Sequence, residues 1–134
     1  MAGTTTIRSF FTVLDLGKTT PPLSVEFTVA GTDANISRTS TLAATTTEAL
    51  QLGTVSVTTT TPWLWLHLIT GGTTKATGLS LCTASATWAD STYQNIILLQ
   101  GQVVCIPVQL STLSVKNLSS SACTYEYAFS GDAS

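Results

Sequence analysis

Apolar and polar residues alternate along much of this chain. The clearest case is residues 23–29, where every second position is apolar and the positions between are Ser, Glu and Thr. Side chains of a β-strand point to opposite faces in turn, so this pattern indicates a half-buried strand. The pattern recurs between clusters of turn-forming residues such as 31–35. It predicts further strands at residues 7–16, 36–42, 49–60, 62–69, 75–83, 95–99, 102–108, 113–118 and 123–129.

The most apolar of these predicted strands is residues 62–69, of sequence PWLWLHLI. Leu64, Leu66 and Leu68 share one face, and both tryptophans lie on the other. Because both faces need cover, this strand is expected to be central or to lie at an interface. We interpret Trp63 and Trp65 as core residues.

Three local features refine this picture. The pair Gly71-Gly72 predicts a two-residue hairpin directly after the apolar strand. Residues 45–50 have room for a single helical turn, and residues 84–94 are expected to form a longer loop. No stretch has a sustained 3.6-residue period, so helices are not expected to contribute otherwise.

These elements predict an all-β fold in one domain spanning residues 1–134, with a short N-terminal arm at about 1–6. Nine or ten short strands are enough for a two-sheet antiparallel β-sandwich of the jelly-roll type. A hydrophobic fraction of 43% supports a core of that size.

The chain is poor in charge. Only 9% of its residues are charged, against about 25% in an average soluble domain. Threonine and serine take their place, in runs such as 4–6, 45–47 and 58–61. Since little charge repulsion is left to keep a free monomer soluble, we expect much of the surface to be covered by other protein.

The charge pattern also excludes some partners. A net charge of −2 with five scattered cations offers no basic surface for nucleic acid. The N-terminus lacks the basic start and apolar run of a secretion signal, and residues 63–69 are too short to span a bilayer. Synthesis in the cytoplasm, with no nucleic acid or membrane partner, is therefore expected.

Candidate catalytic chemistry is sparse. His67 is the single histidine and is interpreted as a packed or interface residue, and the seven carboxylates mostly fall near turns or on strand faces. Cys82, Cys105 and Cys123 are either all reduced, or two of them form a disulfide and one thiol is left over. No nucleophile motif, phosphate loop or metal-ligand spacing is present, so catalytic, cofactor and metal sites are all predicted to be none. The triplets beginning at Asn35 and Asn117 match the N-glycosylation pattern and are interpreted as chance matches.

Contact residues are predicted in two places. Trp88 and Tyr93 lie in the polar loop, where aromatic rings are suited to protein contact or, alternatively, to stacking against a sugar. Thr4, Thr5 and Thr6 form a polar, strand-prone arm that is expected to reach a neighbouring subunit.

Several short segments resemble, in order, the strands and turns of small β-sandwich virion proteins encoded by tailed bacteriophages. The resemblance covers about the last two-thirds of the chain. It rests on EALQLGTV at residues 48–55, PWLWL at 62–66, LLQGQVV at 98–104 with Pro107, LSVKN at 113–117 and TYEYA at 124–128.

This resemblance implies a non-enzymatic structural protein of the virion. The role implied first is that of a decoration or cement protein, a homo-oligomer (often a trimer) that binds the major capsid protein and stabilises the head. A tail, collar or fibre-associated subunit is the alternative within the same class, and a glycan-binding module is the alternative from another class.

Overall fold

The computed structural model describes residues 3–11, 14–15, 18–19, 23–32, 34–56, 61–82, 96–108 and 113–131. Within these ranges the regular secondary structure consists of β-strands, so the all-β prediction is confirmed. Among the same residues no helix is long and apolar enough to cross a membrane.

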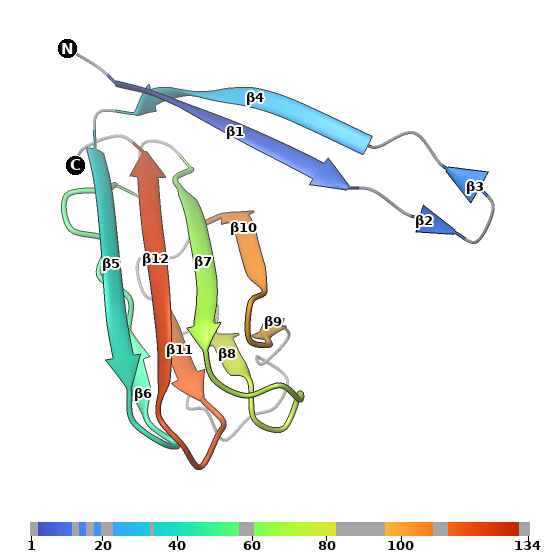
Figure 1. The fold of residues 1–134 in the computed structure, drawn as a ribbon. Coiled ribbons are helices and arrows are strands. Elements are labelled where there is room, and N and C mark those ends of the chain that lie inside the picture. The colour runs from blue at the N-terminus through green and yellow to red at the C-terminus, as the bar shows by residue number, and fades with distance from the viewer. Residues whose placement is uncertain are drawn as a thin grey trace.

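Eight strands form two antiparallel four-stranded sheets (Figure 1). The first sheet has the order β10-β7-β12-β5 and the second the order β6-β11-β8-β9. The strands of the first sheet are β5 (Ala34–Leu42), β7 (Trp63–Thr70), β10 (Val103–Pro107) and β12 (Cys123–Gly131). Those of the second are β6 (Thr47–Ala49), β8 (Leu79–Cys82), β9 (Ile96–Leu98) and β11 (Ser114–Asn117).

The pairing of these eight strands is that of a jelly roll. The first strand pairs with the last (β5 with β12), the second with the seventh (β6 with β11), the third with the sixth (β7 with β10), and the fourth with the fifth (β8 with β9). A long antiparallel hairpin wrapped across two sheets produces this order. The jelly-roll prediction is thus confirmed, although the sandwich has eight strands rather than nine or ten.

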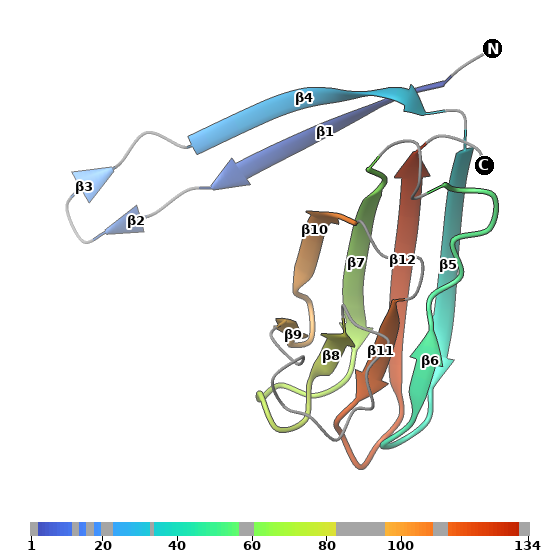
Figure 2. The same cartoon turned by 180° about the vertical axis from the view of Figure 1, so that it is seen from behind.

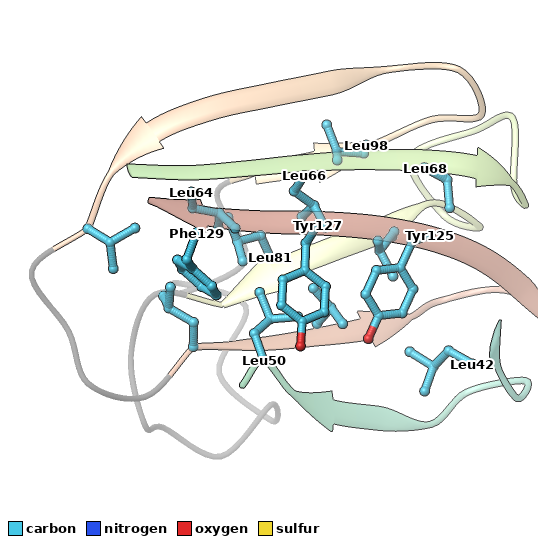
Figure 3. Close-up of a cluster of buried hydrophobic side chains, with 14 of the residues drawn as sticks. Leu42, Leu50, Leu64, Leu66, Leu68, Leu81, Leu98, Tyr125, Tyr127 and Phe129 are labelled. Carbon is cyan, nitrogen blue, oxygen red and sulfur yellow. The ribbon is translucent and has the colours of Figure 1, made fainter. Parts of the chain in front are cut away.

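The core lies between the two sheets (Figure 3). The inner face of β7 contributes Leu64, Leu66 and Leu68, and each of these side chains is fully buried. The strict alternation of buried and half-buried residues along β12 buries three aromatic rings, because every second side chain of a strand points the same way. Those rings belong to Tyr125, Tyr127 and Phe129.

The tyrosine hydroxyls reach from the core to the second sheet, where each finds a hydrogen-bond partner. The Tyr125 hydroxyl donates to Glu48 Oε2 at 2.9 Å, and the same oxygen accepts a bond from the Ser40 hydroxyl at 2.9 Å. The Tyr127 hydroxyl accepts the backbone N–H of Gln51 at 3.0 Å. Figure 3 shows both hydroxyls pointing the same way out of the ring cluster. These bonds tie the edge strand β6 to the first sheet.

Two local predictions are wrong. The pair Gly71-Gly72 does not close a two-residue hairpin; the chain instead crosses to the other sheet and next forms β8 at Leu79. Residues 45–50 hold no helical turn, because a tight turn at Ala44-Thr45 leads directly into β6. In both places the packing of two sheets decides the path, which local patterns do not encode.

The N-terminal residues form a separate two-stranded ribbon. Strand β1 (Gly3–Phe11) pairs antiparallel with β4 (Leu23–Thr32), and between them the short strands β2 (Leu14–Asp15) and β3 (Lys18–Thr19) pair with each other. In both Figure 1 and Figure 2 this hairpin starts near β5 and extends past β10, beyond the sandwich. We call it the hairpin arm.

Candidate interaction surface

The outer face of the β10-β7-β12-β5 sheet has a different chemistry on each half. Opposite residues of an antiparallel pair share a face, so the register sets its composition. On the β12 and β5 half the outward residues are mostly small or hydroxyl-bearing: Thr39, Thr41, Thr124, Ala128 and Ser130. On the β7 and β10 half they are mostly apolar: Trp63, Trp65, Ile69, Val103, Cys105 and Pro107.

The apolar half includes the large hydrophobic side chains that stand out to solvent in the described part of the chain. Trp65 is 37% exposed and Val103 is 49% exposed. Cys105 and Pro107 on the edge strand β10 are exposed as well, and Trp63 is half-buried. We call the group Trp63, Trp65, Val103, Cys105 and Pro107 the apolar strip.

This strip corrects the assignment of the tryptophans to the core. The prediction that residues 62–69 form a central strand with two covered faces is right for the leucine face, which packs between the sheets. It is wrong for Trp65, because the second sheet covers only the inner side of β7. Alternation divides a strand into two faces but does not show which face has a neighbour.

A hydrogen-bonded pair borders the strip. His67 Nδ1 lies 2.8 Å from Glu126 Oε1, and the two side chains are 25% and 35% exposed. The Trp65 and His67 rings lie 5.8 Å apart with their planes at 55°. The pair joins adjacent strands β7 and β12 and marks the boundary between the apolar and hydroxyl-rich halves.

The strip is not arranged for nucleophilic chemistry. Cys105 lies opposite Trp65 in the β10–β7 ladder, and His67 Nδ1 is bonded to Glu126 rather than to the thiol. Partial burial raises the pKa of the Cys105 thiol, whereas a reactive cysteine needs its pKa lowered so that the thiolate forms. The described residues contain no group of three or more His, Cys, Asp or Glu side chains that could hold a metal ion.

The cysteines differ in their surroundings, and none forms a disulfide. Cys82 and Cys123 are buried, as expected for small apolar side chains, whereas Cys105 is exposed on β10. Burial is also the main cause that raises the pKa of the Cys123 thiol. Cys105 is therefore the thiol of the three that a reagent reaches first.

The sequence-predicted contact residues fall into two groups. Thr4, Thr5 and Thr6 lie in β1 of the hairpin arm, where Thr5 pairs with Val29 and Thr6 with Thr28. They belong to a paired strand, β1, that runs from Gly3 to Phe11. Trp88 and Tyr93 lie outside the described residues.

The apolar strip is the feature that the sequence interpretation missed. Its signal was present in the alternation of residues 62–69 and 102–108, which places Trp63, Trp65, Val103 and Cys105 on faces opposite the leucines. Recognising it needed the long-range pairing of β7 with β10, which brings the two apolar faces side by side. Comparisons of the chain with protein-family models, with curated proteins and with solved structures found no match.

Proposed function

We propose that this chain is a structural protein of a bacteriophage virion, in the first place a decoration or cement protein that binds the major capsid protein of the head. It acts as a homo-oligomer, with a trimer favoured. The observation that carries the proposal is the apolar strip, with Trp65 37% and Val103 49% exposed on a chain of which only 9% is charged. Aromatic, charge-poor surface of this kind is typical of the buried centre of protein interfaces.

The rest of the face supports the same role. Its hydroxyl-rich half can be buried at low cost, since a hydrogen-bonded threonine loses far less on leaving water than an ion does. Eight-stranded jelly rolls build both viral capsid and lectin domains. The architecture is therefore compatible with the virion role and with its glycan-binding alternative, and the surface chemistry has to separate them.

The decoration role is tested by co-sedimentation with purified, undecorated heads of the phage that encodes the chain. We expect the protein to pellet with these heads and to raise the temperature at which the shells break. Heads that already carry their decoration protein are the control, because their sites are occupied. If the protein stays in the supernatant and shell stability is unchanged, the decoration role is wrong. Immunogold label confined to tails would then favour the tail or collar alternative.

Glycan binding remains the second candidate because an exposed Trp65 next to the His67–Glu126 pair combines a stacking ring with polar groups. A glycan array probed with the wild type, Trp65→Ala and Trp88→Ala separates the two classes. A glycan signal that either substitution abolishes favours the lectin role, whereas blank arrays for all three proteins exclude it.

A further inference from the structure

Strand β5 is the longest edge strand of the two sheets. It has nine residues, and its ladder with β12 runs from Ala34 to Leu42 without a bulge. Natural proteins protect such edges by keeping them short or by placing proline, charge or a bulge on them. The other edge strands follow this rule, since β10 has five residues and ends on Pro107, and β6 and β9 have three residues each. On β5 the only such device is the charge of Arg38.

The direction of the backbone groups on β5 follows from the bonds of the sheet. The Leu68 N–H donates to the Gln102 carbonyl at 3.1 Å, so the even-numbered residues of β7 bond to β10. The odd-numbered residues of β7 then bond to β12, and the odd-numbered residues of β12 bond to the even-numbered residues of β5. Figures 1 and 2 show no described strand on the other side of β5. Three residues therefore direct their N–H and C=O groups to a free edge: Ser37, Thr39 and Thr41.

The side chains of this edge differ between the two faces of the sheet. Those of Ser37, Thr39 and Thr41 are exposed hydroxyls on the outer face. Arg38 is opposite the buried Tyr127 and so lies on the inner face, where it is exposed and forms no ion pair with a described residue.

An acidic partner for an arginine lies next along the inner face. Ser40 donates to Glu48 Oε2, which also accepts the hydroxyl of Tyr125. No described residue donates to Glu48 Oε1, and the Glu48 side chain is half-buried. This carboxylate can therefore accept a further hydrogen bond from the edge side.

From these features we infer that β5 pairs antiparallel with β5 of a second copy, about a two-fold axis at Thr39. Thr39 is then opposite Thr39 of the partner subunit, and Ser37 is opposite the partner's Thr41. Each free N–H group of the edge meets a carbonyl, and the two four-stranded sheets become one continuous sheet. The inference specifies the self-association included in the proposed function and does not depend on binding to heads. Both copies use the same surface, so the contact closes on a dimer or joins two trimers formed through another surface.

The charge of Arg38 selects both the partner and the register. With the axis at Thr39, Arg38 is opposite Ser40 of the partner subunit in a non-hydrogen-bonded pair, at a Cα distance of about 4.5 Å. Ser40 of its own chain is two residues along the strand, about 7 Å away. The guanidinium is thus closer to the partner's Glu48 than to its own. An axis at Arg38 itself would put two like charges opposite each other, which is unfavourable.

The other pairs match as well, and the size of the contact sets its strength. Half-buried Ile36 is opposite the partner's Leu42 on the inner face, and hydroxyls face hydroxyls on the outer face. The overlap of residues 36–42 is about 24 Å long and, at a depth of about 10 Å, covers about 240 Å² on each copy. A stable complex buries about 800 Å² per partner. We therefore expect a weak, reversible dimer, with a dissociation constant on the order of 0.1 mM.

The first test traps the register by disulfide formation in a Cys105→Ser background, which removes the exposed thiol. Thr39→Cys should form a covalent dimer on mild oxidation, because its two Cα atoms lie about 5.5 Å apart. Thr41→Cys, at an exposed position on the same face of the same strand, is the matched control. Its two copies lie about 14 Å apart and should not cross-link. A mixture of Ser37→Cys and Thr41→Cys should cross-link to each other.

The second test measures the solution mass of the full-length protein up to about 1 mM, above the expected dissociation constant. Thr39→Pro removes an N–H that faces away from β12, so the sandwich should stay folded while the dissociation constant rises about tenfold or more. Arg38→Glu should act in the same direction, because it meets the partner's Glu48 with a like charge. Lys75→Glu makes the same change of charge at an exposed position outside β5 and should have no effect.

Three results would overturn the inference. They are a wild-type mass that stays constant up to about 1 mM, self-association that both Thr39→Pro and Arg38→Glu leave unchanged, and equal cross-linking of Thr39→Cys and Thr41→Cys. Co-sedimentation with heads separates this inference from the proposed function. Binding to heads without any edge pairing keeps the function and removes the dimer contact, whereas a cross-linked dimer that does not bind heads does the reverse.

Discussion

Asn117 is a fully buried polar side chain at the end of β11. Its Nδ2 lies 2.8 Å from the Ser121 carbonyl oxygen, and 3.2 and 3.1 Å from those of Leu42 and Ala43. Its Oδ1 accepts the N–H of Ser119 at 3.0 Å. One amide thus joins the turn after β5 to the turn before β12. A glycan on this buried Nδ2 would have to replace these bonds.

Asn117→Ala should destabilise the protein by about 2–4 kcal/mol, because three carbonyl groups and one N–H lose a buried partner and a cavity remains. Urea unfolding gives the change as a lower midpoint at an unchanged slope. Ser120→Ala, at an exposed position of the same turn, is the control and should shift stability by less than about 0.5 kcal/mol. Equal midpoints for the two variants would show that the turns are held by other contacts.

At the scale of single elements, Gly72 and Gly101 serve different purposes. A Cβ on Gly72 would lie 1.7 Å from the Thr77 carbonyl oxygen, in the segment that crosses from β7 to β8. Gly101 has open space around it but a φ of +81°. It occupies the turn before β10, where the Gln102 N–H donates to the Leu99 carbonyl at 2.9 Å. Gly72 is required by a close approach, and Gly101 by its backbone conformation.

We therefore expect Gly72→Ala to cost about 3 kcal/mol, since backbone atoms must move apart. Gly101→Ala should cost about 1 kcal/mol from the left-handed conformation alone. Thermal unfolding of the two variants beside the wild type measures both effects. A larger loss for Gly101→Ala than for Gly72→Ala would contradict this assignment.

The positions of the strands could be predicted from the sequence better than the pairing between strands. Alternation located β5, β7, β10, β11 and β12 to within a few residues, because each has a core side and an outer side. It also located β4 to within a few residues. It placed a hairpin at Gly71-Gly72, because a glycine pair looks the same in a tight turn and in a crossing between sheets. It also assigned Trp65 to the core, because the exposure of this side chain depends on strand pairings between residues far apart in the chain.

For the molecule as a whole, alkaline pH should weaken the fold. Burial is the main cause that raises the pKa of Tyr125 well above its ordinary value of 10.0, and the hydrogen bond to Glu48 raises it further. Burial likewise raises the pKa values of the Cys105 and Cys123 thiols above 9.0. The unfolded chain releases these protons first, so the stability that these three groups contribute is complete at neutral pH and is lost as the pH rises above about 9.

The measurement is urea unfolding at several pH values between 7 and about 11. Tyr125→Phe should be less stable than the wild type at pH 7, because the bond to Glu48 is lost. It should also lose less stability between pH 9 and 11, since the phenol no longer ionises on unfolding. Parallel curves for the two proteins would mean that Tyr125 does not contribute to the alkaline transition.

The last prediction concerns how stability is distributed between the sandwich and the hairpin arm. The sandwich has its own core of fully buried residues such as Leu64, Leu81 and Phe129, so its amides should exchange slowly at any protein concentration. The arm is a two-stranded ribbon with no second sheet packed on it among the described residues. Its amides should therefore exchange faster than those of the sandwich.

Hydrogen exchange read by mass spectrometry tests this difference. Peptides covering β4 (Leu23–Thr32) should exchange faster than peptides covering β12 (Cys123–Gly131), because β12 lies between two strands of its sheet and buries every second side chain in the core. Equal protection of the two strands in a dilute sample would contradict this distribution of stability.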